Sequence, residues 1–114
     1  MAEFRKLKIY KEAIDFATKI YKFSNTLPNN EKYGLIDQLR RATISVVLNI
    51  AEGSGGSKLE FKRFIRISLS SLYEIDAILE LSVKLGYSKR EDIIEIYRHR
   101  LKLGNMLGKF LKSL

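Results

Sequence analysis

Few residues of this chain have side chains that could carry out covalent or metal chemistry. The sequence has a single histidine, His99, and no cysteine. This excludes disulfides, thiolate metal sites, cysteine nucleophiles and zinc sites that need two imidazoles. A lone histidine at the edge of a helix face is far more often a packing or surface residue than an acid or base. We therefore expect no catalytic residue, no metal and no cofactor, and we predict that the protein is not an enzyme.

Charge is the unusual feature of the composition. The 114 residues include 21 Lys and Arg against 13 Asp and Glu, a formal net charge of +8. A surplus of this size on a small protein attracts polyanions, so nucleic acid is the first partner to test. The length fits one domain, residues 1–114. The first residues lack the apolar stretch of a signal peptide, and no segment approaches the roughly 18 apolar residues of a membrane span. We therefore expect a cytoplasmic protein that does not enter membranes.

Four long helices must position these charges. Proline and glycine interrupt the chain near residues 28, 53–57 and 86, and the intervals between them are too long and too periodic to be strands. Helices of this length joined by short loops pack as an all-α, up-down-up-down four-helix bundle. The expected helices cover about Leu7–Asn25, Glu31–Glu52, Lys58–Leu85 and Lys89–Ser113.

The expected helix ends depend on particular capping residues. Ser57 and Ser88 each precede a glutamate by three residues, which is the spacing of a capping box. Asn29 or Asn30 is expected to cap the second helix. Gly86 is placed to end the third helix in the left-handed conformation.

The first and fourth expected helices each divide into an apolar face and a basic face. On the fourth helix the expected inward residues include Tyr97 and Leu101, and beyond Glu95 the sequence has no acidic residue. The basic residues that we expect to contact nucleic acid are Lys8, Lys11, Lys19, Lys22, Arg98, Lys102 and Lys109.

Arg100 and a pair of glycines on the fourth expected helix each predict a contact with another helix. Arg100 lies within the apolar arc and requires a carboxylate partner, for which Glu74 and Glu52 are the first candidates. Gly104 and Gly108 are four residues apart, a spacing that favours close packing against a neighbouring helix.

The second expected helix carries more apolar surface than one bundle can bury. Ile44, Leu48 and Ala51 fall opposite its core stripe, where they would be exposed to water. Burying one such side chain is worth about 1.5–3 kcal/mol, so a second copy of the chain is the simplest partner. We therefore predict a homo-oligomer with an interface or polar seam that contains Gln38, Arg41, Ile44, Leu48, Asn49 and Glu52.

The sequence of the second expected helix, together with shorter motifs elsewhere in the chain, also resembles the sequences of a known family. The matching residues are Phe4-x-x-Leu7-x-Ile9-Tyr10, Tyr33-Gly-Leu-Ile-Asp-Gln38-Leu-Arg40-Arg41-Ala42, Ser45, Asn49-Ile-Ala-Glu52-Gly53, Glu60-Phe61-x-x-Phe64, Ser71-Leu72-x-Glu74 and Leu85-Gly86-Tyr87. This pattern is similar to the signature of the bacterial four-helix-bundle proteins encoded in intervening sequences of 23S ribosomal RNA genes. The resemblance implies a homo-oligomeric ring or barrel, a pentamer. It also implies a relationship to the accessory variability determinant of diversity-generating retroelements, a basic barrel that binds nucleic acid and a reverse transcriptase.

Three hypotheses for the function follow. The leading one is a non-enzymatic, oligomeric basic scaffold that binds RNA or DNA through phosphates and presents it to a partner protein such as a reverse transcriptase. The alternative is a protein-interaction scaffold without direct nucleic-acid binding. A small nuclease that uses His99 comes third.

Overall fold

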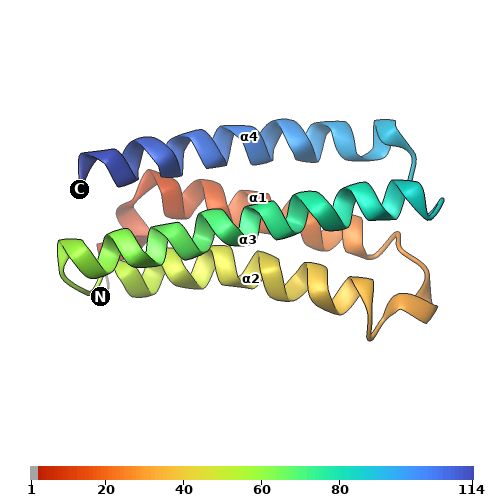
Figure 1. Cartoon of the computed structure of the whole chain (residues 1–114), viewed down its shortest axis with the longest axis horizontal. Coiled ribbons are helices and arrows are strands. Elements are labelled where there is room, and N and C mark those ends of the chain that lie inside the picture. The colour runs from red at the N-terminus through yellow and green to blue at the C-terminus, as the bar shows by residue number, and fades with distance from the viewer. Residues whose placement is uncertain (1–2) are drawn as a thin grey trace.

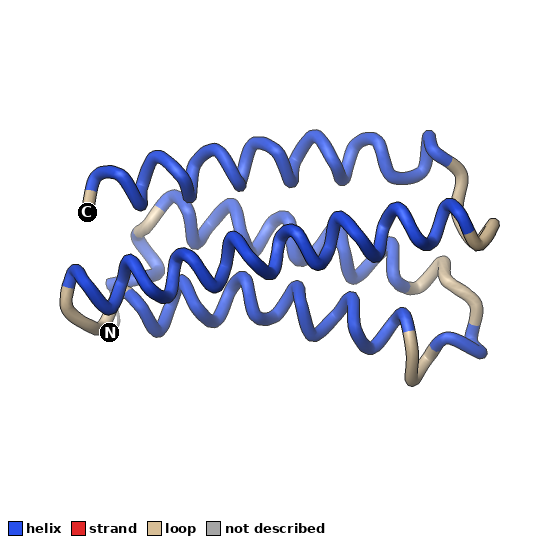
Figure 2. Tube along the Cα trace, viewed as in Figure 1, coloured by secondary structure: helices blue, strands red, loops and turns tan. Residues whose placement is uncertain are grey.

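The computed structural model describes residues 3–114 and is an all-α bundle of four long helices (Figure 1). Among these residues there is no strand, and short loops join the helices (Figure 2). Each helix packs against its neighbours in the chain, and α1 closes the bundle against α4. The predicted four-helix bundle is therefore confirmed. The helices are α1 (Lys8–Ser24), α2 (Leu35–Gly53), α3 (Lys58–Lys84) and α4 (Arg90–Ser113), with short 3-10 turns at Glu3–Lys6 and Asn29–Glu31.

A continuous apolar core fills the bundle along its 43 Å length. Phe16, Leu39, Leu72 and Leu103 are fully buried, one from each helix. All four come from stripes repeating every three or four residues, which is the pattern that buries one face of a helix.

The orientation of α4 differs from the sequence prediction. Tyr97 and Leu101, expected to face inward, are 45% and 44% exposed. Leu103, which the prediction did not place inward, is fully buried. The physical reason is that one face of α4 packs on the bundle through a stripe repeating every three or four residues, and this stripe (Ile93, Ile96, Arg100, Leu103 and Leu107) leaves Tyr97 and Leu101 at its edge.

Both ends of α3 form as predicted. Ser57 Oγ accepts a hydrogen bond from the Glu60 amide at 3.1 Å, and the Glu60 carboxylate accepts one from the Ser57 amide at 3.0 Å. This is the reciprocal arrangement of a capping box. At the other end Gly86 has a φ of +79°, and the Tyr87 amide donates to the Ser82 carbonyl, which closes a Schellman motif.

The predicted caps of α2 and α4 are wrong. At α4 the Asp92 carboxylate accepts from the Lys89 amide at 2.8 Å, so the helix begins one residue later than the Ser88 box would place it. Ser88 Oγ is instead buried without a hydrogen-bond partner among the described residues. At α2 neither asparagine caps the helix, because Asn29–Glu31 form a 3-10 turn. Glu31 Oε1 accepts from the Leu35 amide at 3.1 Å, and α2 starts there.

Within residues 3–114, none of the helices combines the length and the apolar character needed to cross a bilayer.

Candidate nucleic-acid interface

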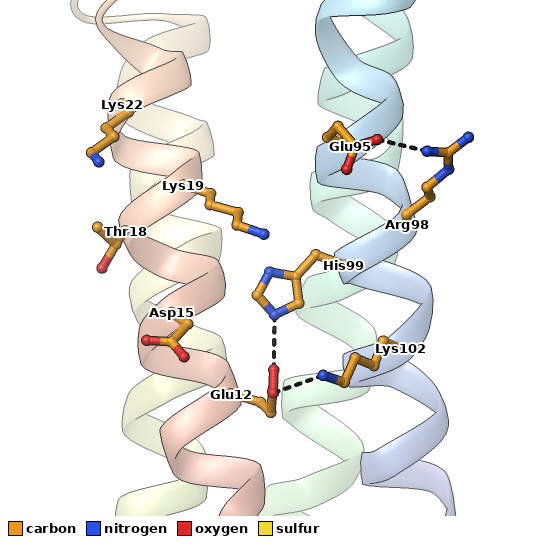
Figure 3. Close-up of a pocket in the computed structure, with 9 residues that line it drawn as sticks. All are labelled: Glu12, Asp15, Thr18, Lys19, Lys22, Glu95, Arg98, His99 and Lys102. Carbon is orange, nitrogen blue, oxygen red and sulfur yellow. Dashed lines mark hydrogen bonds and ion pairs between the residues drawn. The ribbon is translucent and has the colours of Figure 1, made fainter.

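The neighbouring helices α1 and α4 enclose a groove lined mostly by charged side chains (Figure 3). Its volume is about 680 Å³. Four of the basic residues predicted from the sequence meet here, two from each helix, although they are up to 83 positions apart in the chain (Lys19 to Lys102). The lining residues are Glu12, Asp15, Thr18, Lys19, Lys22, Glu95, Arg98, His99 and Lys102.

A second hollow continues the groove toward the chain termini. It has a volume of about 360 Å³ and is lined by Lys8, Lys11, Glu12, Lys102 and Met106. Glu12 and Lys102 line both hollows, so the two adjoin along the α1/α4 surface. We call the two hollows together the α1/α4 groove. It contains every predicted basic residue except Lys109, which is exposed but lines neither hollow.

The cations of the groove fall into two kinds. Arg98 pairs with Glu95 at 2.6 Å and Lys102 pairs with Glu12 at 3.2 Å, so α4 brings cations that are already partly neutralised. The predicted lysines of α1 (Lys8, Lys11, Lys19 and Lys22) are exposed and form no ion pair within the part of the chain that the structure describes. The α1 lysines are therefore the cations most available to a phosphate.

Glu12 is the acidic residue at the centre of the groove. One carboxylate oxygen lies 3.1 Å from His99 Nε2 and the other 3.2 Å from Lys102 Nζ (Figure 3). Burial raises the pKa of Glu12, but the hydrogen bonds from Lys102 and His99 outweigh burial and hold the pKa below its ordinary value. The sequence does not predict this role of Glu12, because its partner His99 lies 87 residues away in the chain.

His99 is a packing residue, as the sequence predicts. Its side chain is only 9% exposed, and its ring meets Phe16 edge-on at 5.6 Å between centroids. Nδ1 is buried and has no hydrogen-bond partner among the residues described.

Positive charge is concentrated at the end of the bundle that holds both termini (Figure 1). The contacts of Ser45 with Ser71 and of Glu12 with His99 mark the middle of the bundle. The part beyond them, formed by residues 3–11, 46–70 and 100–114, contains twelve of the 21 Lys and Arg but only three of the 13 Asp and Glu. This part therefore carries a charge of +9, and the rest of the chain carries −1.

Arg100 finds a partner that the sequence prediction did not name. Its Nε lies 2.9 Å from Asp76 Oδ1, so the expected partners Glu74 and Glu52 are wrong. Asp76 lies on α3 and contacts Arg100 of α4 across the interface between these helices. Burial raises the pKa of the Asp76 carboxyl despite the neighbouring guanidinium. The guanidinium also lies over the Tyr73 ring at 5.2 Å. A helical wheel gives the face of α4 on which Arg100 lies, but it does not give the residue of α3 that lies opposite. For this reason the sequence did not predict the partner.

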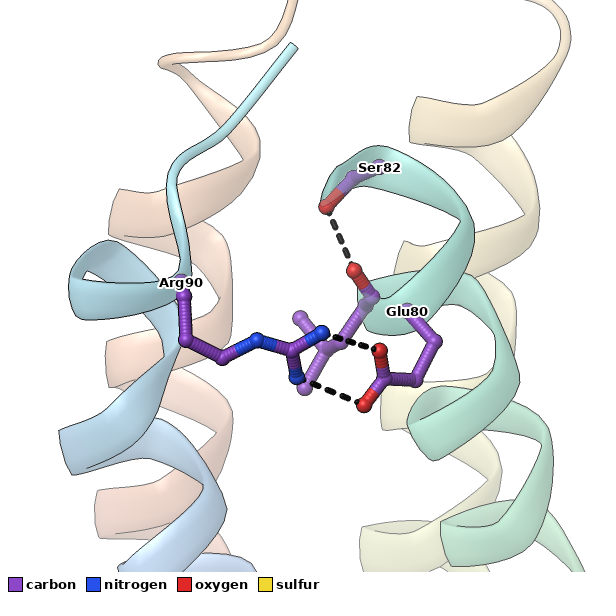
Figure 4. Close-up of polar contacts among 4 residues, drawn as sticks. Glu80, Ser82 and Arg90 are labelled. Carbon is purple, nitrogen blue, oxygen red and sulfur yellow. Dashed lines mark hydrogen bonds and ion pairs between the residues drawn. The ribbon is translucent and has the colours of Figure 1, made fainter. Parts of the chain in front are cut away.

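A second ion pair ties the start of α4 to α3 (Figure 4). Arg90 donates to both oxygens of Glu80, at 2.8 and 3.0 Å. These hydrogen bonds hold the pKa of Glu80 below its usual range. Nearby, the Ser82 hydroxyl donates to a main-chain carbonyl of its own helix, that of Leu79, at 2.7 Å. The pair joins α4 to α3 at the end of the bundle opposite the termini.

The polar row of α2 is partly a seam between helices. Ser45 accepts from Asn49 at 3.1 Å and from the Ser71 hydroxyl at 2.8 Å, which links α2 to α3. Arg41 pairs with Asp37 of its own helix at 2.9 Å. Gln38 and Glu52, the other polar members of the predicted row, are exposed.

The predicted apolar residues of α2 are exposed in the single chain. Ile44 is 44% and Leu48 51% exposed. They line a hollow of about 400 Å³ together with Arg41, Ser45, Asn49 and Glu52. The exposure of Ile44 and Leu48 is as predicted, and their place in an interface stays a prediction.

The fold and the groove define a class of protein, an all-α four-helix bundle with a basic groove between its first and last helices. The model of the 23S rRNA-intervening sequence protein family matches residues 5–109. The chain belongs to this family.

Comparison with solved structures supports the same fold. A protein of unknown function from the S23 ribosomal protein family of Bacteroides thetaiotaomicron is similar with a TM-score of 0.83 and 24% sequence identity. The likeness covers 91% of this chain and 98% of that chain. Comparison with curated proteins finds no match.

Proposed function

We propose that the protein is a non-enzymatic basic scaffold that binds RNA or DNA through phosphate contacts along the α1/α4 groove. The observation that carries the proposal is the row of α1 lysines, which form no ion pair with any residue of 3–114 and line the α1/α4 groove together with Arg98 and Lys102. Lysine and arginine side chains that neutralise phosphates release bound counterions, and this supplies most of the affinity in binding without sequence preference.

The proposed scaffold is cytoplasmic, and it assembles as the homo-oligomeric ring, a pentamer, that the family resemblance implies. An oligomer repeats the groove on every subunit, so many weak phosphate contacts act together on one nucleic acid. The relationship to the accessory variability determinant suggests that the scaffold presents the nucleic acid to a protein such as a reverse transcriptase.

Filter binding tests the proposal directly. At 50 mM salt we expect structured RNA and duplex DNA both to be retained, because phosphate contacts do not depend on sequence. If neither is retained at that salt concentration, the proposed function is wrong.

One observation favours a second function. The groove also contains Glu12, Asp15 and Glu95, and two of these already pair with cations of α4. A surface of mixed charge suits a protein partner as well as a nucleic acid. A protein captured from a lysate that stays bound after nuclease treatment, together with absent filter binding, would favour a protein-interaction scaffold.

A further inference from the structure

Another hollow, with a volume of about 280 Å³, lies between α3 and α4, and we call it the α3/α4 hollow. Four apolar side chains line it, namely Leu79 of α3 and Ile93, Ile94 and Tyr97 of α4. Ile94 is 38% and Tyr97 45% exposed, so part of this apolar lining faces solvent. A concave site with apolar walls and a few polar groups is the usual form of a ligand pocket.

One polar atom of the α3/α4 hollow is free to accept a hydrogen bond. Asp76 Oδ1 accepts from Arg100 Nε at 2.9 Å, whereas Oδ2 has no hydrogen-bond partner within residues 3–114. The Asp76 side chain lines the hollow and is 23% exposed, so a ligand can reach it. Both oxygens of Glu80 are occupied, because Arg90 donates to each of them (Figure 4). The hollow therefore fits a ligand that is partly apolar and carries an N–H donor for Asp76 Oδ2.

The α3/α4 hollow adjoins the α1/α4 groove at Arg98, which lines both. The Arg98 side chain is 71% exposed on the outer surface of α4. Tyr97, the preceding residue, lines the hollow but not the groove. Lys19 and Lys22 line the groove beside Arg98. A nucleic acid whose phosphates contact these cations therefore passes next to the hollow.

We infer that the α3/α4 hollow receives one unpaired base of a single-stranded nucleic acid whose phosphates lie in the α1/α4 groove. The base stacks against the Tyr97 ring, and its exocyclic amino group donates to Asp76 Oδ2. The inference rests on the proposed function and adds a preference for single strands. Aromatic side chains beside a basic groove hold single strands, because every base has a face that stacks. A base inside a duplex cannot reach such a hollow, since it is stacked and paired.

Asp76 makes the hollow selective among bases. Cytosine carries an amino group at the position where uracil carries a carbonyl oxygen. A carboxylate accepts a hydrogen bond from the amino group and is repelled by the carbonyl oxygen. The two bases have the same ring size, so a comparison between them isolates the contact with Asp76.

Fluorescence anisotropy with labelled oligocytidine and oligouridine of about 12 nucleotides tests the inference at neutral pH and 50 mM salt. We expect the wild type to bind oligocytidine about tenfold more tightly than oligouridine, because the hydrogen bond is to a charged group. Asp76→Asn keeps one oxygen for Arg100 and replaces the other by an amide donor. This variant should therefore prefer oligouridine.

Tyr97→Leu removes the ring and keeps an apolar side chain in the hollow. We expect it to bind oligocytidine at least about fivefold more weakly than the wild type. Its affinity for duplex DNA should stay the same, because Tyr97 does not line the groove. Leu101→Ala is the matched control, since Leu101 has a similar exposure of 44% on the same helix and lines neither the groove nor the hollow. Circular dichroism checks that each variant is folded, and Tyr97→Leu carries the test if Asp76→Asn is not.

The outcomes separate this inference from the proposed function. A wild type that binds neither the oligonucleotides nor duplex DNA would overturn the proposed function and the base site together. If duplex DNA binds, equal affinity for the two oligonucleotides or an unchanged affinity in Tyr97→Leu would overturn only the base site. If the wild type assembles in sedimentation and Tyr97→Leu does not, another copy of the chain covers the hollow and the inference is wrong.

Discussion

Glu12 of α1 and His99 of α4 meet across the groove, with Glu12 Oε1 3.1 Å from His99 Nε2. The same carboxylate binds Lys102 through its second oxygen. This arrangement holds the two walls of the α1/α4 groove together, and it places one negative charge among the cations proposed to bind phosphate.

The first prediction concerns the stability that Glu12 supplies. Hydrogen bonds from Lys102 and His99 hold the pKa of Glu12 below its ordinary value of 4.5. This contribution is therefore fully present above about pH 4.5 and is lost as the pH falls through the lowered pKa. We expect Glu12→Gln to lower the free energy of unfolding by about 1 kcal/mol at pH 6. Below pH 4.5 the difference from the wild type should shrink, as urea denaturation at several pH values will show.

Glu95→Gln is the matched control for Glu12. Its pair with Arg98 is exposed on both sides, so the change should stay within about 0.5 kcal/mol. If the difference in unfolding free energy between wild type and Glu12→Gln widened toward low pH, this prediction would be wrong.

The second prediction concerns the buried pair of Arg100 and Asp76. Arg100 is 7% exposed, so removal of its partner leaves a buried charge uncompensated. We expect Asp76→Ala to cost about 3 kcal/mol of unfolding free energy. Adding Arg100→Met should recover part of that loss, because the unpaired charge is then gone. A double variant whose loss equals the sum of the single losses would show that the pair is not coupled.

The third prediction compares two serines with the same sequence pattern. Ser57 caps α3, so Ser57→Ala should cost about 1 kcal/mol. Ser88 Oγ is buried without a partner among the residues described. Ser88→Ala should therefore be neutral or stabilising by up to about 1 kcal/mol. Thermal unfolding of both variants checks this, and equal losses of stability would mean that Ser88 also acts as a cap.

The fold could be predicted from the sequence because it depends on local signals. Helical periodicity, the Ser57 capping box and the φ-positive position of Gly86 each act within a few residues. The start of α2 could not be predicted in this way. It depends on Glu31, whose carboxylate accepts from the Leu35 amide and, through its other oxygen, from the Tyr87 hydroxyl 56 residues away.

The candidate site could be predicted in part. Periodicity placed the lysines of α1 and the cations of α4 on outer faces, and the bundle then brings them to one groove. The partners of buried charges could not be predicted from the sequence. The position of one helix along its neighbour depends on packing of the whole core, so the sequence does not show which residues lie opposite each other. Glu12 with His99 and Asp76 with Arg100 are both cases of this kind.

The most direct test of phosphate binding by the groove is the salt dependence of RNA affinity in two variants of equal charge. Lys8, Lys11 and Lys19 line the groove, whereas Lys32, Lys84 and Lys89 are exposed but line no part of it. Changing either set to glutamine removes three charges. We predict that the groove variant weakens binding at 50 mM salt at least about tenfold and flattens the slope of log affinity against log salt by roughly 2 to 3. The other variant should bind nearly as the wild type does. Equal losses in the two variants would contradict a binding site in the α1/α4 groove.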